Sequence, residues 1–223
     1  MEQLISKEIR WFLSTTGIKP IERWFENLST PQKIADDNVY PRQDFYLNMP
    51  GVKNMGIKIR EPKEDNHYGR WKTKFEVKRQ IETNNKIEFN NQVKGYANKW
   101  QKLSYELTGA EENILSINFP MRTESKEWIR VDKNRIMVQY NAETRRIYQG
   151  DDLLNEACGI ELTKIKIAGN VYYSFGLEAF SKSGNRLDDT FRECCDVVFS
   201  SINSEGLTPD HSFSYPEFLS SLQ

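Results

Sequence analysis

Histidine and cysteine, which supply most transition-metal ligands, are scarce in this chain of 223 residues. With only His67 and His211, the sequence cannot build a multi-histidine metal site. No nucleophile-elbow or related catalytic motif accompanies either histidine. The three cysteines, Cys158, Cys194 and Cys195, are an odd number without metal-ligand spacing, so we expect reduced structural thiols.

Long apolar runs and a large net charge are also absent. No stretch approaches the roughly 18 apolar residues of a membrane span, and the N-terminal MEQLISKEIRWFL has neither the basic start nor the apolar core of a secretory signal. We therefore expect a cytoplasmic protein without a membrane partner. Lysine and arginine (31) nearly cancel aspartate and glutamate (32), which argues against a generally basic nucleic-acid binder but leaves a local basic site open.

Aromatic residues, in contrast, are abundant. The 12 Phe, 10 Tyr and 5 Trp are too many for a disordered segment and indicate a buried core. The chain is long enough for one large domain or two small ones, and an all-β barrel of this length usually folds as one unit. We expect a single domain over 1–223, with a barrel over 4–180 and a C-terminal helix and tail over 187–223.

Period-2 alternation of apolar and polar residues dominates the chain and predicts a mainly β (α+β) fold. Turn residues at Lys133-Asn134 and at Ala168-Gly169-Asn170 predict two hairpins. Helical periodicity predicts helices over 18–28 and 187–202, and a weaker one over 151–157. Residues 84–95 are polar and predict a connection. The expected strands are 4–13, 42–48, 55–61, 70–82, 98–107, 127–133, 135–141, 160–168 and 171–180.

Charged side chains gather on one face of these strands, because residues i and i+2 point to the same side. In WKTKFEVK, Lys72, Lys74, Glu76 and Lys78 alternate with uncharged residues. Six acidic residues share this face: Glu8, Asp44, Glu76, Glu106, Asp132 and Glu178. Twelve basic residues do so: Arg10, Arg42, Lys58, Arg60, Lys72, Lys74, Lys78, Lys102, Arg130, Arg135, Lys164 and Lys166. The face therefore carries an excess of six positive charges in a chain of net charge −1.

This charged face has two interpretations. On an open antiparallel sheet it would face water, as a solvated surface or an interaction module. In a closed barrel with the face inward, the cations would converge in a lumen that needs water, paired acids and a bound polyanion. A phosphate chain suits such a lumen, since lysine and arginine bind phosphate oxygens and carboxylates can hold Mg²⁺ or Mn²⁺ beside them.

At these charged strands the chain resembles the CYTH superfamily, the triphosphate tunnel metalloenzymes. The family signature Glu-x-Glu-x-Lys corresponds to Ser6-x-Glu8-x-Arg10 in SKEIRWFL, so a serine replaces the first glutamate and an arginine the lysine. Gly176 stands where the last strand of the family has its first glutamate. The later charged strands resemble the family through Lys58 and Arg60 in GIKIRE, Glu76 and Lys78 in FEVKR, and Glu178 in SFGLEAF.

The resemblance implies a closed eight-stranded antiparallel β tunnel with helices packed outside, and a triphosphate threaded into its lumen. It implies Mg or Mn held by Glu8 and Glu178. Glu76 and Asp44 are candidate catalytic groups that activate water, although each could instead only offset neighbouring cations. The candidate phosphate-binding residues are Arg10, Arg42, Lys58, Arg60, Lys72, Lys74, Lys78, Arg130, Arg135, Lys164 and Lys166.

Three functions follow from these patterns. The family includes inorganic triphosphatases, thiamine triphosphatases and class IV adenylate cyclases, so a metal-dependent triphosphatase acting on a polyphosphate-bearing small molecule is the first. The second is a non-catalytic protein that binds a phosphorylated ligand or an RNA 5′ end, which Ser6 and Gly176 favour because each removes a metal-binding acid. The third is an interaction module with a solvated charged sheet.

Overall fold

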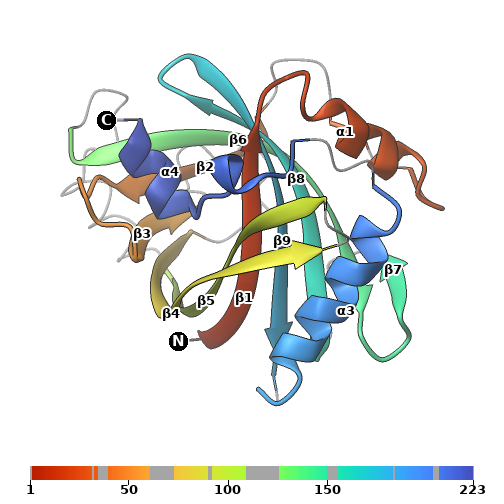
Figure 1. Ribbon diagram of the computed structural model, residues 1–223. Coiled ribbons are helices and arrows are strands. Elements are labelled where there is room, and N and C mark those ends of the chain that lie inside the picture. Colours follow the sequence, from red (N-terminus) through yellow and green to blue (C-terminus); the bar gives the residue numbers. More distant parts are fainter. Residues whose placement is uncertain are drawn as a thin grey trace.

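The strands of this protein close into a barrel (Figure 1). The structure is a computed structural model that describes residues 2–31, 33–34, 40–60, 73–89, 92–108, 126–149, 155–182, 184–202 and 206–222. Eight strands pair in the closed antiparallel order β2-β3-β4-β5-β1-β9-β8-β6, with β6 returning to β2, and a short β7 extends the sheet from β6. The fold class expected from the sequence is confirmed. The strands are β1 (Glu2–Leu13), β2 (Arg42–Leu47), β3 (Met55–Arg60), β4 (Lys74–Phe89), β5 (Val93–Glu106), β6 (Trp128–Asn141), β7 (Arg146–Tyr148), β8 (Glu156–Ile167) and β9 (Asn170–Ser181).

Two helices cover the outside of the barrel. These are α1 (Lys19–Glu26), with Pro20 in its first turn, and α3 (Leu187–Phe199), which lies against β8 and β9 (Figure 1). Their apolar faces join Trp11 of β1, Ile160 of β8 and Leu177 of β9 in the largest buried cluster. Both helices were expected from the sequence. No helix in the described ranges is long and apolar enough to cross a membrane.

A third helix, α4 (Tyr215–Ser221), fills one end of the barrel. A capping box begins it, because the Ser214 hydroxyl accepts from the Glu217 amide while the Glu217 carboxylate accepts from the Ser214 amide. Phe218 packs with Phe12, which shares the lumenal face of β1 with Glu8 and Arg10. The apolar cluster at this end comprises Phe12, Tyr46, Val131, Ile165, Ile167, Phe218 and Leu219. The barrel is therefore closed at one end by the C-terminal helix.

The hairpin predicted at Ala168-Gly169-Asn170 is present between β8 and β9. Ala168 and Gly169 have positive φ angles of 48° and 84°, as a two-residue type I′ turn requires. The hairpin predicted at Lys133-Asn134 is wrong, because β6 runs through both residues and pairs continuously with β8. Such a polar pair has turn propensity, but ladder hydrogen bonds on both sides of β6 hold it extended.

Two further expectations fail at strand ends. The connection predicted over 84–95 is largely strand, since β4 extends to Phe89 and β5 begins at Val93. The polar composition there reflects an exposed hairpin arm rather than a loop. The helix predicted over 151–157 is replaced by β8 from Glu156 onward, while 151–154 lies outside the described residues.

We expect α4 to stabilise the barrel by filling its end. The ring of Phe218 stacks on that of Phe12, with centroids 3.7 Å apart. Phe218→Ala should lower the free energy of unfolding by about 3 kcal/mol in urea denaturation, because it leaves a cavity among packed side chains. Leu222→Ala, in the exposed cap of the same helix, should change it by less than about 1 kcal/mol. An equal effect of the two substitutions would contradict the packing of α4 inside the barrel.

Candidate functional site

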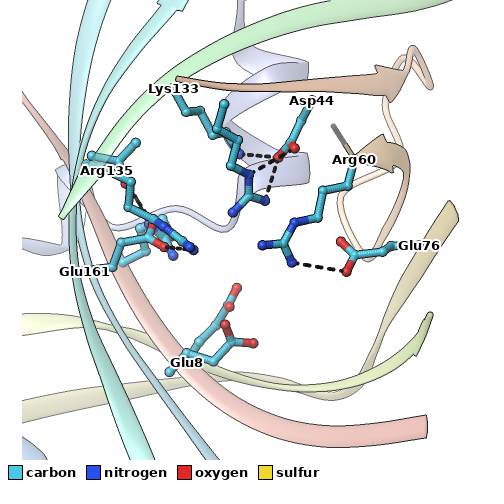
Figure 2. A network of polar contacts seen from close by, with 12 residues as sticks. Glu8, Asp44, Arg60, Glu76, Lys133, Arg135 and Glu161 are labelled. Carbon is cyan, nitrogen blue, oxygen red and sulfur yellow. Dashed lines mark hydrogen bonds and ion pairs between the residues drawn. The ribbon is translucent and has the colours of Figure 1, made fainter. Parts of the chain in front are cut away.

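The lumen of the barrel holds a charged cavity of about 200 Å³. In Figure 2, Arg60 and Arg135 reach from opposite walls toward the central space, and Glu8 points into it from a third side. Asp44 is fully buried in the same network, bonded to three of the lining cations. The lining has eight cations and four carboxylates, namely Arg10, Arg42, Lys58, Arg60, Lys78, Lys102, Lys133 and Arg135 with Glu8, Glu76, Glu161 and Glu178. With Asp44, eight cations face five carboxylates, an excess of three positive charges among the described residues.

Tyr215 and Pro216 of α4 form the closed end of this cavity. The Tyr215 ring lies 4.2 Å from the Lys133 ammonium and 5.0 Å from the Arg10 guanidinium. The side chains of Lys133 and Arg10 are only 5% and 7% exposed, whereas that of Lys102 is 27% exposed. The cavity is therefore a blind pocket, deepest at α4 and wetter away from it.

Asp44 of β2 is the centre of the most buried ion cluster. It accepts a bidentate pair of hydrogen bonds from Arg42 at 3.1 and 3.0 Å, and bonds from Lys133 at 2.9 Å and Lys58 at 3.3 Å. Burial acts to raise the pKa of Asp44, but the charges of Arg42, Lys133 and Lys58 lower it well below its usual value. Asp44 is thus a permanent anion.

Glu76 of β4 is a second shared carboxylate. Its oxygens lie 3.0 Å from Lys58, 3.7 Å from Arg60 and 3.9 Å from Lys102. Burial opposes the charge of Glu76, yet Lys58, Lys102 and Arg60 lower its pKa. Burial lowers the pKa of Lys102, although the charges of Glu178 and Glu76 act to raise it. At this wall one carboxylate is therefore shared by three cations.

Glu161 of β8 holds two arginines on the opposite wall. Its carboxylate accepts from Arg10 at 2.9 Å and from Arg135 at 3.2 Å, and Thr163 donates to it at 2.9 Å. Burial acts to raise the pKa of Glu161, but Arg10 and Arg135 lower it well below its usual value. Glu161 therefore fixes the two guanidinium groups at the cavity wall.

Glu8 and Glu178 face each other as Cα partners of β1 and β9. Between them lies the Lys78 ammonium, 2.5 Å from Glu8 and 3.0 Å from Glu178. Although burial acts to lower it, these two carboxylates raise the pKa of Lys78. Burial acts to raise the pKa of Glu178, but Lys78 and Lys102 lower it to about 2. The described residues contain no group of three or more His, Cys, Asp or Glu side chains arranged to hold a metal ion.

Most of the predicted charged residues meet in the lumen, but four lie on the outer face of the barrel. Arg130 is on the face of β6 opposite Lys133 and Arg135, where it pairs with Asp132 at 3.0 Å. Lys164 and Lys166 follow Ile160 and Leu162 on the outer face of β8, and both lie 5.8 Å from the ring of Tyr40. Lys74 pairs with Glu106 at 3.7 Å, and Lys72 lies outside the described residues. The expectation that Arg130, Asp132, Lys164 and Lys166 face the lumen is wrong.

The sequence interpretation missed Lys133, Glu161 and Tyr215. The sequence pattern predicts a turn at Lys133, and it places Glu161 on the outward face of its strand. On β8 the apolar residues change face along the strand: Ile160 and Leu162 pack outside, whereas Ile165 and Ile167 pack inside against α4. The signal in the sequence was Glu161 itself: an acidic residue between Ile160 and Leu162 indicates that the face of β8 opposite these two apolar residues carries charge.

No family model and no curated protein matches this chain. A solved structure that is similar to it is the crystal structure of a "putative adenylate cyclase" from Bacillus halodurans. The two chains are 13% identical, and the alignment covers 91% of this chain and 94% of that one with a TM-score of 0.38.

The Asp44 cluster generates a stability prediction. Asp44→Asn should lower the free energy of unfolding by about 3 kcal/mol, because it leaves three buried cations without their shared anion. Asp132→Asn is the matched control, since Asp132 pairs with the more exposed Arg130 on the outer face of β6, and it should cost less than about 1 kcal/mol. Urea denaturation of both variants measures the difference. Equal losses of unfolding free energy in the two variants would show that burial of the Asp44 cluster does not add to stability.

Proposed function

We propose that the lumen binds the phosphate chain of a polyphosphate-bearing ligand. The observation that carries this proposal is the excess of three positive charges in a blind, enclosed cavity. Converging cations repel one another, and a polyanion bound among them relieves that repulsion. Arginine forks and lysine ammonium groups match phosphate oxygens in charge and geometry.

The shape of the cavity supports a terminal phosphate chain rather than a polymer passing through. Tyr215 and Pro216 close one end, so a ligand enters and leaves by the other. The cavity of about 200 Å³ far exceeds the roughly 10–15 Å³ needed for one water molecule. The charged end of the ligand would lie among Arg60, Arg135 and Lys102, with its remaining part toward the mouth.

The environment of the candidate catalytic acids favours binding over hydrolysis. Asp44 and Glu76 each contact three cations, and the pKa of each carboxyl is lowered by them despite burial. A general base works best with a pKa near the working pH, which neither acid has. We therefore assign both acids to holding the cations in place. Closure of the barrel also removes the basis for a solvated charged sheet, since the charged face is lumenal.

Inorganic tripolyphosphate is the direct probe of this proposal. Calorimetric titration should show one site, and thermal unfolding should shift upward because the ligand binds only the folded state. Arg60→Ala and Arg135→Ala should each weaken binding about tenfold or more, as loss of a charge-assisted hydrogen bond does. Arg79→Ala removes an arginine that bonds Gln101 at the exposed surface, and it should leave affinity unchanged. Absence of binding, or equal effects of all three substitutions, would refute the lumenal site.

Binding should take up protons at alkaline pH. Burial lowers the pKa of Lys102 below its ordinary 10.5, although Glu178 and Glu76 act to raise it, so part of the Lys102 population is neutral as the pH approaches that value. A bound polyanion favours the charged form, so affinity should fall with rising pH and binding at about pH 9.5 should be linked to proton uptake. Calorimetry in buffers of different ionisation enthalpy measures this uptake, which Lys102→Gln should reduce. Proton release at that pH would contradict the account.

A further inference from the structure

The position between Glu8 and Glu178 is occupied by a cation that belongs to the chain itself. The Lys78 ammonium bonds both carboxylates, at 2.5 and 3.0 Å, and lies 5.4 Å from the Trp100 ring. Ser6 also donates to Glu178, at 2.8 Å. The two acids that the family resemblance would give to a divalent metal are therefore already engaged with one ammonium and one hydroxyl.

A second chain cation takes the space that an acidic side chain on β9 would need. The Arg10 guanidinium lies directly over Gly176, where a Cβ atom would be 2.8 Å from Cζ and 3.0 and 3.1 Å from the two Nη atoms. Arg10 is held there by bonds to Glu161 at 2.9 Å and Ser174 at 3.1 Å. A side chain at position 176 therefore cannot be accommodated unless Arg10 moves.

These residues do not fit a divalent metal. Mg²⁺ is usually bound through one or two carboxylates together with waters and substrate phosphates, but Lys78 already bridges the two carboxylates of this wall. A metal at that place would have to displace the ammonium, and it would then lie among the remaining cations of the lumen, Arg10 and Lys102 included. Both replacements relative to the family pattern, Ser6 and Gly176, remove carboxylate oxygens from the same wall.

We propose that Lys78 replaces the divalent metal, so that the lumen binds its polyphosphate without Mg²⁺ or Mn²⁺. This inference rests on the proposed polyphosphate binding. An ammonium has three N–H donors, and the bonds to Glu8 and Glu178 leave a third for a phosphate oxygen. The two carboxylates and the Trp100 ring fix the charge in place. Lys78 thus supplies a preorganised positive charge at the wall where the resemblance places a metal.

The test compares tripolyphosphate binding to the intact protein in EDTA and in saturating Mg²⁺. The inference expects the affinity in EDTA to equal or exceed that in Mg²⁺, because free Mg²⁺ competes for the ligand. Binding only with Mg²⁺, or at least tenfold tighter with it, would overturn the inference and leave the polyphosphate site standing. Absence of binding under both conditions would refute the proposed function and this inference with it.

Electron paramagnetic resonance of Mn²⁺ provides a readout that does not depend on the ligand. The wild-type protein should leave the signal of free Mn²⁺ unchanged, whereas Lys78→Met should bind Mn²⁺ because it frees Glu8 and Glu178. Lys99→Met is the matched control, since Lys99 also bridges two carboxylates, Glu82 at 2.8 Å and Asp188 at 3.4 Å, on the outer surface. Mn²⁺ bound by the wild type and released by Glu8→Gln would overturn the inference.

Discussion

Asp44 neutralises the seam at which this barrel closes. Closure depends on the pairing of β2 with β6, which sets Arg42 directly beside Lys133 as Cα partners. Two like charges at a buried seam repel each other, and Asp44 bonds both of them while also bonding Lys58 from β3. One carboxylate thus joins three strands. The pairing that closes the lumen and the positions of Arg42, Lys58 and Lys133 in it depend on this cluster.

Once the barrel is closed, its charged side chains leave bulk water and must find partners inside. Three of the five lumenal acids each contact more than one cation: Asp44 and Glu76 contact three each, and Glu161 contacts two. The acids hold the cations in defined positions but leave an excess of positive charge. Ion pairing therefore stabilises the walls, and the remaining excess of positive charge is the basis of the proposed anion binding. At the wall with Lys78 the sharing is reversed, because one ammonium pairs with two facing glutamates. In the proposed account this ammonium replaces the external cation that the glutamates would otherwise attract.

Period-2 alternation predicted the strands because it is strong where a strand separates a charged lumen from an apolar outer layer. Lys58 and Arg60 on β3, and Glu76 and Lys78 on β4, were placed correctly on the lumenal face for this reason. Alternation alone left an open sheet possible, and the family resemblance supplied the expectation of a closed barrel. The assumption that charged residues face the lumen fails where the lining of the lumen changes from charged to apolar. Near α4 the lumen is apolar, so Ile165 and Ile167 point inward while Lys164 and Lys166 point outward.

The contribution of the C-terminal helix could not be read from alternation at all. YPEFLSSL was visible only as a short terminal segment, and nothing in its spacing shows that Tyr215 lines a cavity built by distant strands. Lys133 was hidden in a similar way, since its neighbour Asn134 gives the pair the composition of a turn. Both residues acquire their roles from contacts across the barrel: Lys133 pairs with Asp44, and its ammonium lies over the ring of Tyr215. Local sequence does not encode such contacts.

The most direct test of this account is a crystal structure of the protein with tripolyphosphate. The account predicts a phosphate chain in the lumen, with oxygens bonded to Arg60 and Arg135 on opposite walls and Lys78 still between Glu8 and Glu178. Phosphate found only at the outer face, beside Lys164 and Lys166, with water alone in the lumen, would contradict it.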